Sequence, residues 1–324
     1  MKIRNLSTLL GVTAAAVCVG LVTGQAAKAG TLGPDWTYTM DSFTDGHDGN
    51  IGVGKNSNYE MYGMAMRAKD GIISIAFNAN LALAGQADSA ADGNIGWGDV
   101  LFNFTGKSLK DASATGSLFG IRFAGSNDSG VAGTGVFSGV TAKSVASDNS
   151  GYKTFSQYQN DVNNSSPNTN TGTTGGQIGY GGVTVPEAKS YLTDVNGVSQ
   201  DTDYGQLNVI KTGTKVGDIS FLGASEIASL ASGFAGLGGI GKYTVGFSFS
   251  ETLLGKFLQP ANAVITLLEE CTNDGMIVKA TLPSVPDSEP VPEPITIVGM
   301  ALGGLGLVKG KINQRRAARA NVTA

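Results

Sequence analysis

The feature that most constrains the fold of this chain is a set of short runs in which apolar and polar residues alternate. Gly, Asn, Asp or Ser bounds each run, and these residues favour turns. Because successive side chains of a strand point to opposite faces, the pattern predicts strands with one buried face. We therefore expect an all-β fold, a single antiparallel β-sandwich-like domain with a few short helices. The runs are residues 59–66, 71–83, 99–104, 117–123, 243–250, 263–269 and 275–282.

Helical signals are few. Residues 155–162 have amphipathic spacing, residues 184–195 place Pro186 in a first turn, and Ser225 is expected to cap a short helix over 225–231. The stretch 160–182 is rich in Gly, Asn and Thr and has no periodicity, so it predicts a long surface loop.

The amino terminus has the pattern of a secretory signal peptide. Lys2 and Arg4 precede an apolar core, and the small residues Ala27 and Ala29 flank Lys28. This small-x-small site predicts cleavage before Gly30 by signal peptidase, after export by the secretion machinery. The alternative, a retained anchor, fits less well because Thr and Gly interrupt the apolar run.

Charge is distributed unevenly along the chain. Residues 30–294 contain all 26 Asp and Glu residues but only 14 of the 22 Lys and Arg residues, which gives this region a net charge of −12. Nucleic acid is therefore not an expected partner, because phosphate binding requires clustered basic charge. An acidic surface instead favours solubility and attracts cations.

The carboxyl terminus combines a Pro-Glu-Pro triplet, an apolar run and a basic end. The run 295–308 would span about 21 Å as a helix, which is shorter than a hydrocarbon core of about 30 Å. The basic residues after it, including Arg315 and Arg316, would stay cytoplasmic and act as a membrane stop. A transient stay in the membrane fits both the short length and the basic flank.

This terminus resembles a PEP-CTERM sorting signal, in which a Pro-Glu-Pro triplet precedes a glycine-rich apolar span and an arginine-rich end. The resemblance implies that exosortase, a membrane-embedded cysteine protease, recognises Pro292, Glu293 and Pro294 and cuts near them. Lys309 and Lys311, which stand before the paired arginines, depart from the pattern. Blocks between about residues 35 and 282, such as GWGDVLFNFTG and LFGIRFAGSNDSGV, are similar to cyanobacterial exosortase-dependent surface proteins.

Together these features predict five segments and a cell-surface or extracellular location. They are a signal peptide (1–29), a β-rich extracellular domain (30–282), a Pro-rich stalk with the triplet (283–294), a transmembrane sorting segment (295–308) and a basic cytoplasmic tail (309–324). The expected function is that of a structural surface or matrix protein. The alternative is a surface module that binds calcium or exopolysaccharide.

Enzymatic activity is not expected. The mature chain has one histidine, His47, and lacks the G-x-S-x-G, HExxH and phosphate-loop motifs. It also has one cysteine, Cys271, which we expect to be a buried small hydrophobe, with pairing to another molecule as the alternative.

The sequence indicates no cofactor other than a possible calcium site. Asp41, Asp45, Asp48 and Asn50 crowd into ten residues, and the oxygen-rich turns 125–130 and 272–275 have similar chemistry. Ordinary turn formation is the alternative for all of them. Trp36, Trp97, Tyr152 and Tyr180 could stack on sugar rings, although packing in the core or at a sheet edge is the expected role for most of them.

Overall fold

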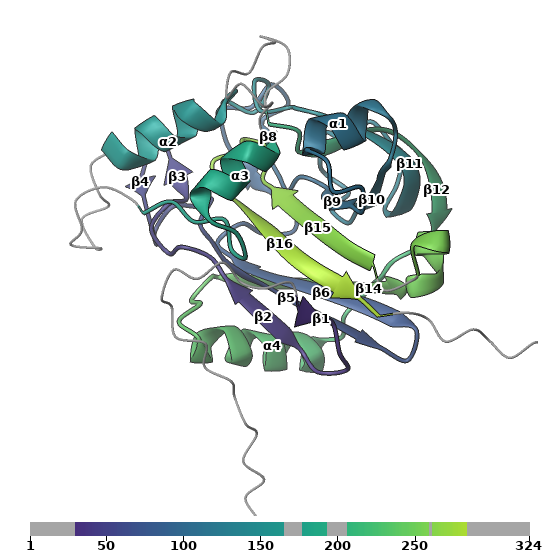
Figure 1. Ribbon diagram of the computed structural model, residues 1–324. Coiled ribbons are helices and arrows are strands. Elements are labelled where there is room, and N and C mark those ends of the chain that lie inside the picture. The colour runs from purple at the N-terminus through teal and green to yellow at the C-terminus, as the bar shows by residue number, and fades with distance from the viewer. Residues whose placement is uncertain (1–29, 165–176, 193–205, 259–260, 284–324) are drawn as a thin grey trace, which may run out of the picture. The chain divides into compact units, whose positions relative to one another are not determined.

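The computed structural model describes residues 30–164, 177–192, 206–258 and 261–283 (Figure 1). Strands make up 39% of the structure and helices 19%, so the prediction of a mostly β domain with a few short helices is confirmed. Within the described ranges, no helix is long and apolar enough to cross a membrane. The predicted signal peptide, sorting segment and basic tail lie outside the described residues, as does all but the first residue of the predicted stalk.

Two sheets form the body of the fold. The first has the strand order β1 (Gly30–Thr31), β16 (Gly275–Leu282), β15 (Ala261–Leu268), β9 (Val100–Asn103), β10 (Leu118–Arg122), β11 (Gly135–Lys143) and β12 (Val209–Gly217). The second has the order β13 (Ser220–Phe221), β14 (Tyr243–Ser250), β6 (Ile72–Ala79), β5 (Met61–Lys69) and β2 (Thr37–Met40). Neighbouring strands are antiparallel, except that β1 runs parallel to β16.

Three further short elements lie outside the two sheets. Two of them are two-stranded ladders, β3 (His47–Asp48) with β4 (Gly52–Val53), and β7 (Gln86–Ala87) with β8 (Asn94–Ile95). The third is a 3-10 segment, η1 (Glu251–Leu258), which follows β14.

The alternation of the sequence places the core between the sheets. Ile73, Ile75 and Phe77 of β6 lie in the same buried cluster as Phe102 of β9 and Ile265 of β15. This cluster draws residues from both sheets, so the sheets pack face to face. Most residues of β5, β6, β9, β10 and β16 are buried on both faces of their sheets, and only one of these faces packs in this cluster.

Helices cover the outer faces of both sheets. Apolar residues of α1 (Leu109–Ala114), α2 (Phe155–Asn164) and α3 (Val185–Leu192) share a second buried cluster with the first sheet. α4 (Ala224–Gly236) lies along the second sheet, beside β2 and β5 in Figure 1, and packs Leu230 and Phe234 on it.

Two local predictions need correction. Ser225 does not cap α4, because the helix begins one residue earlier and Gly223 occupies the N-cap position. Part of the stretch 160–182 is not a surface loop either. Residues 160–164 belong to α2, and Tyr180 is buried, because its ring stacks on Phe155 and fills the cluster beneath the helices.

Candidate metal centre

Four buried acidic side chains gather where the ends of three strands meet. Asp41 directly follows β2, Glu60 directly precedes β5, Asp274 directly precedes β16, and Asp45 lies between β2 and β3. One carboxylate oxygen each of Asp45, Glu60 and Asp274 lie within 4.8 Å of one another. We call Asp41, Asp45, Glu60 and Asp274 the acidic cluster.

Backbone N–H groups orient every carboxylate of the acidic cluster. Met61 N–H in the second sheet donates to Asp274 Oδ2 (2.7 Å), in the turn between β15 and β16 of the first sheet. This bond ties the two sheets together at the cluster. The other donors are Gly181 N to Asp41 Oδ1 (2.8 Å), Gly179 N to Asp45 Oδ2 (2.6 Å), Gly46 N to Glu60 Oε2 (2.9 Å) and Gly275 N to Asp274 Oδ1 (2.7 Å).

Two of these donors require glycine. A Cβ atom on Gly179 would lie 2.7 Å from Asp41 Oδ1, and one on Gly46 would lie 2.5 Å from the Cα atom of Glu60. Both distances are shorter than a carbon atom tolerates. Absence of a side chain therefore lets each backbone segment approach closely enough for its N–H group to reach a carboxylate.

Burial dominates the electrostatics of the acidic cluster. It raises the pKa of Asp45 to about 7, against the opposing effect of the hydrogen bond from Gly179. Burial, and then the neighbouring charge of Asp45, raise the pKa values of Asp41, Glu60 and Asp274 well above the ordinary range. The low-dielectric surroundings thus make four ionised carboxylates costly unless something compensates their charge.

The structure brings together part of the metal site that the sequence predicts. Asp41 and Asp45 belong to the acidic cluster, but Asp48 and Asn50 do not. Asp48 instead accepts from Asn50 N–H (2.9 Å), Ile51 N–H (3.2 Å) and Asn58 Nδ2 (2.9 Å), so it organises the turn between β3 and β4. Asn50 is exposed at that turn. The contacts of these two residues fit the alternative, ordinary turn formation.

Two members of the acidic cluster carried weaker signals in the sequence. Asp274 lies in the oxygen-rich turn 272–275, but no sequence pattern indicates that this turn lies near another acidic residue. Glu60 was missed, because it reads as a polar position within the alternating run 59–66. No local pattern joins it to Asp274, and only the packing of the two sheets does so.

Most of the other candidate residues pack in the core. Cys271 is fully buried, which agrees with a core role, and burial raises the pKa of its thiol. Trp97, Tyr152 and Tyr180 are buried as well. His47 Nδ1 lies 2.9 Å from the Tyr152 hydroxyl, and burial lowers the pKa of its imidazole. The guanidinium of Arg67 lies 4.6 Å from the ring centroid of Trp36.

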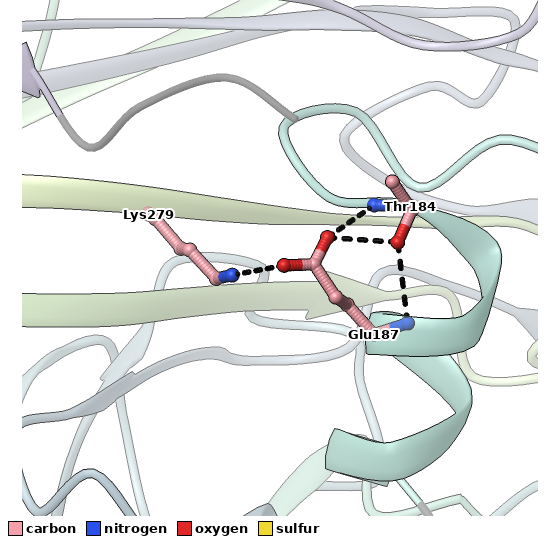
Figure 2. A network of polar contacts seen from close by, with 3 residues as sticks. All are labelled: Thr184, Glu187 and Lys279. Atoms are coloured by element: carbon pink, nitrogen blue, oxygen red, sulfur yellow. Dashed lines mark hydrogen bonds and ion pairs between the residues drawn. The ribbon is translucent and has the colours of Figure 1, made fainter. Parts of the chain in front are cut away.

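A shallow cavity of about 300 Å³ lies between α3 and the outer face of β15 and β16. Glu187 and Lys279 line it and form an ion pair of 2.7 Å, and Figure 2 shows Thr184 on the other side of the same carboxylate. The charged groups of Glu187 and Lys279 are thus paired with each other.

Comparisons with protein-family models, with curated proteins and with solved structures find no match for this chain.

Proposed function

We propose that the protein is an exported, non-enzymatic structural protein of the cell surface or extracellular matrix, which exosortase sorts and cleaves through its carboxyl terminus. One observation carries this proposal: a signal peptide pattern and a Pro-Glu-Pro triplet with an apolar span and basic end occur on the same chain. Either pattern alone would be weak support. Their combination at opposite ends accounts for export, temporary retention in the membrane and release.

The fold of the described residues supports the proposal. We propose that these residues form a single β-sandwich ectodomain, an architecture common in cell-surface proteins. The first strand begins at Gly30, so cleavage before this residue would leave β1 intact.

The surroundings of the reactive side chains favour a structural role over catalysis. The Cys271 thiol is buried and its pKa is raised, which disfavours the thiolate that a nucleophile requires. The hydroxyl of Tyr152 engages the imidazole of His47. Neither group has the partners of a nucleophilic triad in the geometry that the structure describes.

The alternative of a ligand-binding surface module divides into two cases. Three of the four aromatic side chains that could stack on sugar rings, Trp97, Tyr152 and Tyr180, are buried in the core. Exopolysaccharide binding is therefore the weaker of the two cases. Calcium binding is compatible with the structural role, and the acidic cluster favours it.

Replacement of Glu293 by Ala tests the sorting proposal. The substitution leaves the apolar span and basic end in place, so we expect normal insertion but accumulation of uncut precursor in the membrane. Glu289→Ala is the matched control, because Glu289 also precedes a proline but lies outside the triplet. We expect mass spectrometry of surface protein to find amino termini at Gly30 and no peptide beyond residue 308. Such peptides in mature surface protein would contradict cleavage and favour a permanent short anchor.

A further inference from the structure

Three carboxylates of the acidic cluster share an unusual hydrogen-bonding state. In Asp41, Asp45 and Glu60 a backbone N–H group holds one oxygen, while no donor among the described residues reaches the other: Asp41 Oδ2, Asp45 Oδ1 and Glu60 Oε1. Each residue is at least 91% buried, so bulk water does not satisfy these oxygens. Buried polar atoms without partners are rare and costly, and they require an explanation.

The hydrogen bonds also fix the orientation of the cluster. A carboxylate with one oxygen anchored to the backbone can turn its second oxygen only within a narrow range. Oriented carboxylates of this kind are how proteins hold metal ligands in position. The ordered oxygens lie on segments far apart in sequence, so the packing of the fold, not a local turn, creates the arrangement.

Charge gives a second reason to expect a cation. The strongest charged influences on the pKa values of Glu60 and Asp274 come from other acids. The ion pairs that the structure describes, Arg67 with Glu226, Lys215 with Asp218 and Lys279 with Glu187, lie elsewhere. Four buried acids therefore need either protons or a bound cation to offset their mutual repulsion.

The ligand chemistry indicates which cation. All side-chain ligands are carboxylate oxygens, which hard cations prefer. Calcium binds oxygens at about 2.4 Å, so two oxygens on opposite sides of one ion are about 4.8 Å apart. The nearest oxygens of Asp45, Glu60 and Asp274 all lie within 4.8 Å of one another. The three oxygens are therefore close enough for one calcium ion to bind them after small side-chain adjustments.

We propose that Asp45, Glu60 and Asp274, with Asp41 beside them, form a calcium site that fastens the two sheets to each other. Glu60 approaches from the second sheet and Asp274 from the first. Asp41 and Asp45 accept hydrogen bonds from the segment 177–182 that leads into α3. A bound ion would thus secure α3 as well. This role goes beyond sorting to the surface and does not depend on it.

A calcium titration of the full-length protein tests the proposal. The protein is stripped with EGTA, and its melting temperature is measured with added calcium, with added magnesium and with neither. We expect saturating calcium to raise the melting temperature by about 5–10 °C, because the ion binds the folded state and not the unfolded one. Magnesium should act much more weakly, since it requires a smaller octahedral site.

Terbium provides a direct readout of binding. The Tyr158 hydroxyl donates to the carbonyl oxygen of Asp45 (3.2 Å), so a terbium ion in the site would lie close to this ring. We expect tyrosine-sensitised terbium emission that calcium displaces. Tyr158→Phe should weaken this emission, because phenylalanine sensitises terbium poorly, but it should keep the calcium-induced rise in melting temperature, because the four carboxylates remain.

Glu60→Gln separates a ligand from a merely structural carboxylate. The glutamine oxygen can still accept from Gly46 N–H, so the fold should survive. Without calcium we expect the variant to melt at or above the temperature of the parent, because one repulsive acid is gone. The calcium-induced rise should disappear, together with terbium emission.

Asp48→Asn is the matched control, since Asp48 is a similarly buried acid in the segment between β2 and β5 but lies outside the cluster. It should keep the full calcium response. Absence of a calcium-induced rise in the parent protein would overturn the proposal and leave protons as the groups that neutralise the cluster. If Glu60→Gln kept the calcium-induced rise in melting temperature, or if Asp48→Asn lost it, the proposed set of ligands would be wrong.

Discussion

At the scale of single residues, Asp99 shows how burial makes stability depend on pH. Its carboxylate accepts from Asn127 Nδ2 (2.8 Å) and from Ile210 N–H (2.7 Å), which fastens the start of β9 to β12. Burial raises the pKa of Asp99 from 3.8 to about 6, although both hydrogen bonds oppose the rise. Between these two values the folded state holds a proton that the unfolded state has released. The contribution to stability is complete below pH 4 and is lost as the pH rises through about 6.

We predict that Asp99→Asn flattens this part of the stability profile. The free energy of unfolding of the parent should fall from pH 4 to pH 7 by roughly 2–3 kcal/mol more than that of the variant. Urea denaturation in EGTA at several pH values measures the difference between the two curves, so a constant offset between the proteins does not matter. Parallel curves would show that Asp99 ionises in the folded protein as it does in the unfolded chain.

The acidic cluster illustrates what single residues reveal in a sequence. Crowding of acidic residues in one short segment identified Asp41 and Asp45, which the structure places in the acidic cluster. The same reasoning selected Asp48, which lies outside the cluster, since an Asx turn and a metal loop use the same residue types. Glu60 and Asp274 are far apart in sequence and meet only through the packing of two sheets. No spacing rule can join them.

At the scale of elements, α3 depends on contacts at its amino end. Thr184 N–H donates to Glu187 Oε2 (2.8 Å), and Glu187 N–H lies 3.4 Å from Thr184 Oγ1, so the two residues form a capping box (Figure 2). Lys279 of β16 donates to the other oxygen of Glu187 (2.7 Å). The Lys279 and Thr184 hydrogen bonds lower the pKa of Glu187 to about 2, so its interactions are lost only as the pH falls to that value.

We predict that Thr184→Ala lowers the free energy of unfolding by about 1 kcal/mol, whereas Thr184→Ser has little effect. Lys279→Met should cost less than about 1 kcal/mol, because the ion pair is partly exposed to solvent. Hydrogen exchange should show faster exchange over α3 in Thr184→Ala than in the parent. Equal protection of α3 in both proteins would mean that packing of Ala188 and Leu192, rather than the cap, holds the helix.

Helices and strands differ in how clearly the sequence pattern predicts them. Each of the seven alternating runs contains a strand, although most of these strands are buried on both faces. β12 was missed since it is a sheet edge with most residues exposed on both faces, so alternation has no cause there. Register shifts against its neighbours obscure the pattern of β11. α1, with six residues, is too short for a helical period to be visible.

At the scale of the whole molecule, the residues after the predicted cleavage site join both sheets. Gly30 and Thr31 pair with Ala280 and Thr281 of β16, and Leu32 N–H donates to the carbonyl of Thr281 (2.9 Å). The next carbonyl, that of Gly33, accepts from Ala68 N–H of β5 (2.9 Å) in the second sheet. These residues therefore lie against β16 and bridge the two sheets.

Leu32 is the anchor of this bridge, because its side chain is 97% buried in the core between the sheets. We predict that a chain of residues 30–283 unfolds in one cooperative transition, and that Leu32→Ala lowers its free energy of unfolding by about 2–4 kcal/mol through loss of burial and formation of a cavity. Thr31→Ala, at an exposed neighbouring position, should cost much less. Urea denaturation of the three proteins measures these differences. If Leu32→Ala proved as stable as Thr31→Ala, the first strand would be dispensable, and a mature terminus several residues beyond Gly30 would serve the fold equally well.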